Sequence, residues 1–271
     1  MWIYPHHNGY LFMLKSLPEL RHAAEEFARL GGDSTLNYFK KSFQLEFKED
    51  DSPVTNADQT AERLIRDQIN QQFPDHGIIG EEFGEENTDS EVVWVLDPID
   101  GTQSFIHGVP FYTTLIGILI DNKPEIGVIY APALEEMASA AVGHGCTLNG
   151  KNTGVRECTD LSKATFLSTE VTTFAQYGFS APFSELLNKT RLHRTWGDAY
   201  GHMMVATGRA DIMIDPILNI WDAAALLPIV TEAGGSYSDV HGEPSIKTGN
   251  AISTNSSLLP EILSLFDTKD D

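Results

Sequence analysis

Two aspartates, Asp97 and Asp100, stand three residues apart at the end of the apolar run 92–96. The run is typical of a buried β-strand, and a strand that ends at the rim of a sheet brings both carboxylates to one place. Neighbouring carboxylates repel each other unless a proton or a cation lies between them. A hard divalent cation such as Mg²⁺ prefers oxygen ligands and keeps positions open for water and phosphate. The pair therefore indicates a magnesium site, although a plain strand followed by an Asp-Pro turn is an alternative.

Three further acids lie where the sequence predicts that helices or strands begin or end. Asp58 and Asp222 fall at the start of predicted helices, where the helix dipole favours a carboxylate, so each has an ordinary explanation as a capping residue. Glu81 follows Gly80 after a short predicted strand, and a solvated loop would explain it equally well. The five acids together are harder to explain as unrelated residues.

The composition excludes several classes of protein. The formal charge of −21 in 271 residues argues against nucleic-acid binding, which needs basic patches. A phosphate-bearing substrate would need local cations, for which bound metals are candidates. No run of ~18 apolar residues predicts a membrane span. Cys146 and Cys158 show neither metal-ligand spacing nor the pattern of a disulfide framework, so we expect a reducing cytoplasm.

The order of predicted elements indicates an α/β fold whose first half has α+β character. A helix begins after Ser16, with Glu19 completing a capping box, and Gly31-Gly32 should end or kink it. A second helix is predicted over 56–73. The remaining predictions are strands at 78–79, 92–96, 111–120, 125–130, 137–142, 165–168, 211–215 and 251–254, and helices at 182–188, 198–207, 221–233 and 258–266. This order predicts layers of helices and mixed sheets.

We expect two lobes, joined through the glycine-rich segment 143–154. Residues 1–150 would form an α+β lobe that carries most of the acids. Residues 151–271 would form an α/β lobe that carries Asp222 and the substrate pocket.

Three short motifs resemble those of the inositol monophosphatase superfamily, which comprises metal-dependent, lithium-sensitive phosphatases. The motifs are Gly80-Glu81-Glu82, Asp97-Pro98-Ile99-Asp100-Gly101-Thr102 and Trp221-Asp222-Ala223-Ala224, and they occur in the order and at the spacing of that superfamily. The resemblance covers about residues 20–266. It implies the layered αβαβα sandwich of the inositol monophosphatase and fructose-1,6-bisphosphatase type, and a homodimer.

The resemblance also implies roles for the matching residues. Two or three Mg²⁺ ions, or Mn²⁺, would be held by Glu81, Asp97, the carbonyl of Ile99, Asp100 and Asp222. Thr102, with Asp58 as its hydrogen-bond partner, would orient the attacking water, so that Glu81, Thr102 and Asp58 form the catalytic group. The N–H groups of Gly101 and Thr102 would contact the phosphate, and Lys48 matches a phosphate-proximal residue only loosely.

The segment 194–201 bears on the substrate. Inositol-specific members usually carry a small Gly-Thr-Ala there, whereas this chain has Trp196 and Asp198 and resembles the histidinol-phosphate phosphatase branch. Asp198 and Asp215 would accept hydrogen bonds from the ammonium and imidazole of the leaving group, with Asp222 beside it. Trp196 or Tyr200 would add a cation–π contact of about 0.5–2 kcal/mol. A helix cap for Asp198 and a core position for Trp196 are the alternatives.

The sequence therefore predicts a Mg²⁺-dependent phosphomonoesterase that hydrolyses L-histidinol phosphate in histidine biosynthesis. The first alternative is another small phosphate ester, such as inositol 1-phosphate. Two alternatives of other classes are a catalytically inactive regulator on the same fold and a chain whose acids are structural caps that bind no metal. The expected partner is a small phosphorylated metabolite, with neither nucleic acid nor membrane involved.

Overall fold

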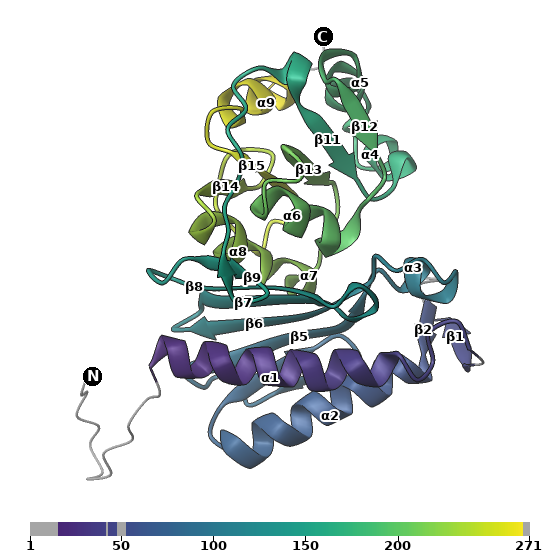
Figure 1. Ribbon diagram of the computed structural model, residues 1–271, viewed down its shortest axis with the longest axis vertical. Coiled ribbons are helices and arrows are strands. Elements are labelled where there is room, and N and C mark those ends of the chain that lie inside the picture. The colour runs from purple at the N-terminus through teal and green to yellow at the C-terminus, as the bar shows by residue number, and fades with distance from the viewer. Residues whose placement is uncertain (1–15, 42, 48–52, 268–271) are drawn as a thin grey trace.

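The computed structural model describes residues 16–41, 43–47 and 53–267, and these form five layers (Figure 1). Helices α1 (Leu17–Thr35) and α2 (Asn56–Gln72) cover one face of an eight-stranded sheet. Its other face contacts α6 (Asp198–Ala206), α7 (Ile220–Ala223) and α8 (Leu226–Glu232), and of these α6 and α8 also contact a five-stranded sheet. The outer face of that second sheet is covered by α4 (Val171–Gln176), α5 (Ser180–Lys189) and α9 (Leu259–Phe266). The predicted αβαβα sandwich is confirmed.

The eight-stranded sheet has the order β10-β9-β8-β7-β6-β5-β3-β4, and only the pair β3–β5 is parallel. Helices cover both faces of the central strands, which explains why those strands are apolar throughout rather than alternating. Its strands are β3 (Gly77–Gly80), β4 (Gly84–Glu86), β5 (Val92–Asp100), β6 (Thr113–Ile120), β7 (Lys123–Ala131), β8 (Glu136–Ala141), β9 (Cys146–Leu148) and β10 (Lys151–Asn152). An antiparallel meander runs from β5 to β10.

The five-stranded sheet has the order β12-β11-β13-β15-β14 and mixes parallel and antiparallel pairs. Its strands are β11 (Thr165–Ser168), β12 (Leu192–Arg194), β13 (Ile212–Asp215), β14 (Gly235–Ser238) and β15 (Ala251–Asn255). A short hairpin of β1 (Leu45–Phe47) and β2 (Pro53–Thr55) precedes α2, and α3 (Thr102–Ile106) follows β5. The first large sheet ends at Asn152 and the second begins at Thr165, while the division into two lobes at residue 150 stays a prediction.

Helix α1 shows where the prediction from sequence was right and where it was wrong. The capping box of Ser16 and Glu19 is present. The helix does not end or kink at Gly31-Gly32 but continues to Thr35. A β-carbon at Gly31 would lie 2.6 Å from Ile65, and one at Gly32 would lie 2.6 Å from Tyr130. The two glycines therefore serve close packing of α1 on α2 and the sheet, which outweighs their poor helix propensity.

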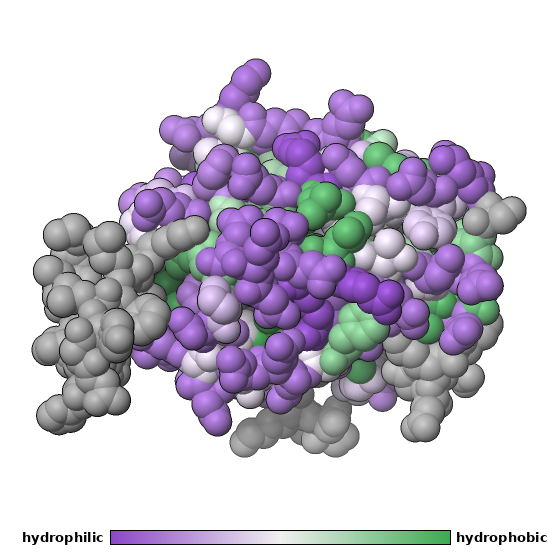
Figure 2. Space-filling model, turned by 90° about the horizontal axis from the view of Figure 1, so that it is seen from below, coloured by the Kyte–Doolittle hydropathy of each residue, from purple (hydrophilic) through white to green (hydrophobic). Residues whose placement is uncertain are grey.

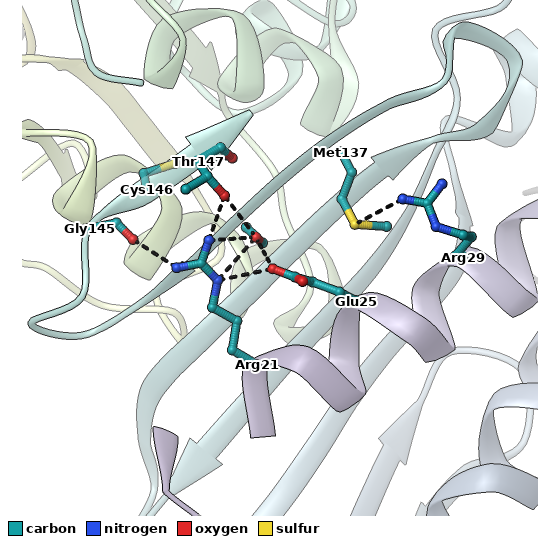
Figure 3. Close-up of polar contacts among 8 residues, drawn as sticks. Arg21, Glu25, Arg29, Met137, Gly145, Cys146 and Thr147 are labelled. Carbon is teal, nitrogen blue, oxygen red and sulfur yellow. Dashed lines mark hydrogen bonds and ion pairs between the residues drawn. The ribbon is translucent and has the colours of Figure 1, made fainter. Parts of the chain in front are cut away.

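A polar network ties α1 to the far edge of the eight-stranded sheet (Figure 3). Arg21 donates hydrogen bonds to Ser139 Oγ at 2.8 Å and Thr147 Oγ1 at 2.5 Å, and it pairs with Glu25 at 3.1 Å.

Seen from the side of α1 and α2, the surface is largely hydrophilic with small apolar patches (Figure 2). Among the described helices, none is both long and apolar enough to cross a bilayer.

Candidate active site

A β-bulge in β5 turns Asp97 and Asp100 to the same face of the sheet. In a regular strand, residues three apart point to opposite faces. Here Asp97 lies opposite Leu115 and Asp100 lies opposite Thr113, so three steps on β5 match two steps on β6. Since residues 113 and 115 share a face, so do the two aspartates. The strand thus continues through both acids, whereas the sequence suggested that it ends before them.

Glu81 lies beside Asp97 because β3 and β5 are parallel neighbours. Gly80 pairs with Leu96, and the next N–H, that of Glu81, donates to the Leu96 carbonyl at 3.2 Å. Corresponding ends of parallel strands meet at one edge, so Glu81 and Asp97 emerge together. The charge of Glu81 is, after burial, the largest cause that raises the pKa of Asp97.

Asp222 reaches the same place from the other end of the chain. It is the third residue of α7, where its Oδ2 accepts a hydrogen bond of 2.6 Å from the N–H of Asn219. The predicted capping role is therefore present, and it coexists with a position in the acidic cluster. One carboxylate oxygen from each of Asp97, Asp100 and Asp222 lies within 4.8 Å of the other two.

The electrostatics of the cluster fit a divalent cation. Burial is the first cause and neighbouring carboxylates the next in raising the pKa of Asp97 and of Asp100 well above their ordinary values. Burial also raises the pKa of Asp222 to about 6. Such groups take up protons unless another positive charge compensates them. An all-oxygen donor set of this kind suits Mg²⁺ or Mn²⁺.

The backbone around the cluster is arranged by Ile99, Gly101 and Thr102. The Ile99 carbonyl accepts a hydrogen bond of 3.0 Å from Thr102 Oγ1, and the Ile99 N–H donates to Asp97 Oδ1 at 3.1 Å. Gly101 has a φ of +79°, in the region that favours glycine, and it precedes the first residue of α3. All three residues line the cavity described below.

Asp58 is buried in the capping box of α2, and the negative charge of Glu81 is close enough to help raise its pKa. Its Oδ2 accepts from Thr55 N at 2.8 Å and Thr55 Oγ1 at 2.6 Å. Burial is the main cause that raises its pKa to about 6. The Thr102 hydroxyl donates to Ile99 rather than to Asp58, so the catalytic partnership of Thr102 with Asp58 stays a prediction.

The acids open into a cavity of about 270 Å³. Glu81 and the acidic cluster line this cavity, and so do Thr169, Glu170, Asp198 and Asp215, none of which belongs to that cluster. No Lys, Arg or His is among the lining residues within the part of the chain that the structure describes. A phosphate group could enter such a cavity only with cations, whereas a positively charged organic group matches the acids outside the cluster.

Asp198 lies next to the acidic cluster, close enough for its charge to raise the pKa of Asp100. It begins α6 with a φ of +53°, and Gly197 rather than Asp198 is the N-cap. Burial raises its pKa to about 7, with Asp215 and Asp222 as further causes. A β-carbon on Gly101 would lie 2.8 Å from Asp198 Oδ2, so the carboxylate of Asp198 lies against the backbone that directly follows Asp100. The predicted alternative, a helix cap, is not observed.

Asp215 is held from behind by a chain of hydrogen bonds. Its Oδ1 accepts from Thr169 Oγ1 at 2.6 Å, and its Oδ2 lies 3.1 Å from His202 Nε2. The other ring nitrogen of His202 lies 2.6 Å from Ser253 Oγ, and this histidine is fully buried. The carboxylate of Asp215 therefore has one orientation, facing the cavity.

The two aromatic residues expected beside the substrate lie elsewhere. Trp196 packs against the buried cluster of Leu167, Val205, Ala210 and Met213 and does not line the cavity. Tyr200 stacks on Phe111 and lies under the guanidinium of Arg209. A cation–π contact from either to a substrate therefore stays a prediction without geometric support. Lys48 lies outside the described residues.

Several residues of the site had no signal in the sequence. Thr113 donates to Asp100 Oδ2 at 3.0 Å, and the N–H of Ala199 donates to the same oxygen at 2.8 Å. Thr169 and Glu170 line the cavity because β11 ends there. These positions depend on contacts across 13 to 99 residues of sequence, which no local pattern reports.

Fold and site together define an enzyme of the phosphatase class. The model of the inositol monophosphatase family matches residues 16–270, and the chain belongs to that family. A histidinol-phosphatase of Chlorobaculum parvum is 43% identical over 87% of this chain and 91% of its own length. A histidinol-phosphatase of Streptomyces coelicolor is 35% identical over 91% and 96%. The solved structure of an inositol monophosphatase from Zymomonas mobilis superposes with a TM-score of 0.83, at 31% identity over 94% of this chain and all of that one.

Proposed function

We propose that this phosphatase is a Mg²⁺-dependent phosphomonoesterase that hydrolyses L-histidinol phosphate to L-histidinol and phosphate. The observation that carries the proposal is the distribution of acids in one cavity. A cluster suited to cations lines this cavity, and Asp198 and Asp215, which do not belong to the cluster, line the same cavity. The identity of 43% to a histidinol-phosphatase supports the same substrate.

The proposed metal-binding roles are those that the family resemblance implies, and the grouping of Asp97, Asp100 and Asp222 supports one of the two sites. Glu81, Asp97 and the Ile99 carbonyl would hold one Mg²⁺, and Asp97, Asp100 and Asp222 would hold a second. Glu81 would also face a third, weaker ion. When bound, these ions supply the positive charge that offsets the phosphate and lowers the pKa of a coordinated water.

The chain itself positions the reactants. Thr102, at the start of α3, would orient the attacking water through its hydroxyl, and its N–H and that of Gly101 would donate to phosphate oxygens. Asp58, which is close enough to Glu81 to feel its charge, is the proposed hydrogen-bond partner of Thr102. The attack breaks the bond between phosphorus and the leaving oxygen, which then takes a proton from solvent.

The leaving group would account for the acids outside the metal cluster. Histidinol carries an ammonium and an imidazole, and Asp198 and Asp215, with Asp222 beside them, can accept hydrogen bonds from both. Hydrogen bonds that involve a charged partner are roughly twice as strong as neutral ones. An uncharged polyol can donate hydroxyl hydrogen bonds to these carboxylates but gains no attraction between opposite charges.

A second substrate is favoured by the likeness to the Zymomonas inositol monophosphatase. The two candidates are separated by kcat/KM of the purified protein for L-histidinol phosphate and inositol 1-phosphate, each with Mg²⁺. We expect a preference for histidinol phosphate, and equal values or a preference for inositol 1-phosphate would contradict the proposal. A homodimer and a cytoplasmic location stay predictions, which sedimentation analysis and cell fractionation would test.

A further inference from the structure

Glu62 is a carboxylate on α2 with no exposed surface, and it binds the loop that follows β3. Its Oε2 accepts a hydrogen bond of 2.8 Å from the N–H of Glu82, and its Oε1 accepts one of 3.2 Å from the N–H of Phe83. Glu62 does not line the cavity. It therefore holds the backbone directly after Glu81 without approaching the substrate.

Arg66 completes the arrangement one helical turn further along α2. Its Nε donates to Glu62 Oε1 at 2.7 Å, and its terminal nitrogen donates to the carbonyl of Gly84. The ion pair neutralises a charge that would otherwise be buried alone at a large cost. Together the two side chains bind the loop at three successive residues, 82 to 84.

Gly80 shows how closely α2 approaches the residue before Glu81. A β-carbon there would overlap Glu62 Oε1 and would lie 2.7 Å from the terminal nitrogen of Arg66. Only glycine fits between β3 and this pair. Gly80, which precedes Glu81, therefore packs against the Glu62–Arg66 ion pair. Residues 82–84, which follow Glu81, are hydrogen-bonded to the same pair.

This support matters because Glu81 lies at a weak place in the sheet. Asp97 and Asp100 belong to β5, which pairs with β6 as far as Asp100, whereas the loop of Glu81 leads into β4, a three-residue edge strand that is exposed throughout. Short edge strands hold a backbone poorly by themselves. The orientation of Glu81 therefore depends on contacts from outside the sheet.

We propose that Glu62 and Arg66 are positioning residues that hold Glu81 in place as a metal ligand, an inference that rests on the proposed function. Residues that support metal ligands typically change metal affinity by about 10–100-fold when they are replaced. Glu62 acts through Glu81 and contacts neither metal nor substrate.

The test is a calorimetric titration of the metal-free full-length chain with Mn²⁺, as wild type and as Glu62→Gln. Glutamine keeps the size of the side chain, but its NH₂ group replaces one of the two accepting oxygens. At least one N–H that now donates to Glu62 would therefore lose its acceptor. We expect the dissociation constant to rise by about 10–100-fold. Activity should largely recover at saturating Mg²⁺, so that the concentration for half-activation changes far more than kcat.

The matched control is Glu25→Gln, which breaks a similar pair one turn apart, Arg21–Glu25, on the other helix of the same layer (Figure 3). It should leave metal affinity unchanged. Unchanged affinity in Glu62→Gln, or an equal loss in Glu25→Gln, would overturn the inference. If Glu62→Gln does not fold, the Arg66→Lys variant takes its place. It removes the hydrogen bond to the Gly84 carbonyl, and we expect the same rise in the dissociation constant for Mn²⁺. A wild-type protein that binds no Mn²⁺ would instead overturn the metal site of the proposed function, and this inference with it.

Discussion

Thr169 Oγ1 lies 2.6 Å from Asp215 Oδ1 and at the same time accepts a hydrogen bond of 2.7 Å from the N–H of Asp198. One hydroxyl therefore binds both the carboxylate of Asp215 and the backbone of Asp198. β11 stops at Ser168, which lies opposite Ile214, so Thr169 follows level with Asp215, the last residue of β13. The relative position of the two residues, and hence the shape of the group they can bind, depends on this hydroxyl.

Replacing Thr169 by valine keeps the volume and removes the hydroxyl. We expect kcat/KM for L-histidinol phosphate to fall by about tenfold or more, because a hydrogen bond to a charged group contributes about 1.5–3 kcal/mol. The value for an ester whose leaving group is uncharged, such as inositol 1-phosphate, should change much less. Thr169→Ser keeps the hydroxyl and should restore most of the selectivity. An equal loss with both substrates in the valine variant would contradict the role in selectivity.

Replacing Asp97 by asparagine should abolish most hydrolysis. Asp97 is the carboxylate that both proposed metal positions share, so we expect kcat/KM to fall by about a hundredfold or more at fixed Mg²⁺. The fold should persist, since the change removes a buried negative charge that its neighbours repel. Phosphate release and thermal unfolding, measured together, test this. Asp121→Asn, at an exposed turn, is the control. Undiminished turnover in Asp97→Asn would rule out the proposed centre.

The pH dependence of the free energy of unfolding should differ between the metal-free and the Mg²⁺-bound protein. Burial raises the pKa of Asp198 to about 7 and those of Asp222 and Asp58 to about 6, from ordinary values near 3.8. Between about pH 4 and pH 7 the folded state then binds more protons than the unfolded state, so the metal-free protein loses stability as the pH rises through this range. Bound Mg²⁺ replaces those protons.

The rise in melting temperature on adding Mg²⁺ should therefore be larger at about pH 8 than at about pH 5. Differential scanning fluorimetry with EDTA or with Mg²⁺ at the two values measures it. The control is the Asp97→Asn variant, in which the difference should shrink. A larger rise at the lower pH would show that these carboxylates are not where the ions bind.

Trp196 should affect stability rather than selectivity. It packs against Leu167, Val205 and Met213 and does not reach the cavity. Trp196→Phe should therefore lower the free energy of unfolding by about 1–3 kcal/mol. The ratio of kcat/KM for histidinol phosphate and inositol 1-phosphate should stay the same. A drop in that ratio without a loss of stability would restore the predicted cation–π contact.

The sequence identified the acids of the site because their residue types are unusual where apolar strands and helices begin or end. The longer helices and central strands were also predictable, since their apolar spacing reports burial directly. The strands β4, β9, β10, β12 and β14 were not predicted, because none of them contains two adjacent apolar residues, whereas the equally short strands β3, β11 and β13 do. The helix predicted over 221–233 is divided into α7 and α8.

What the sequence could not report are contacts between distant segments. His202 looked like any helical residue, and only the fold places it between Asp215 and Ser253. Trp196 was interpreted as a substrate contact from its place beside Asp198, but its side chain turns into a hydrophobic cluster instead. The bulge of β5 was hidden for a related reason. Proline lacks an N–H and normally ends a central strand, yet Pro98 is tolerated at an irregular position in the ladder.

That bulge makes the number of residues between Asp97 and Asp100 as important as their identity. A chain shortened by one residue in this interval would regain regular alternation and would still keep both acids on one face, but it would lose the extra residue of the bulge. A lengthened chain would lose the pairing with Thr113. A one-residue insertion or deletion there would therefore alter the backbone between the two acids, including the Ile99 carbonyl that is a proposed metal ligand, whereas a substitution changes only a side chain.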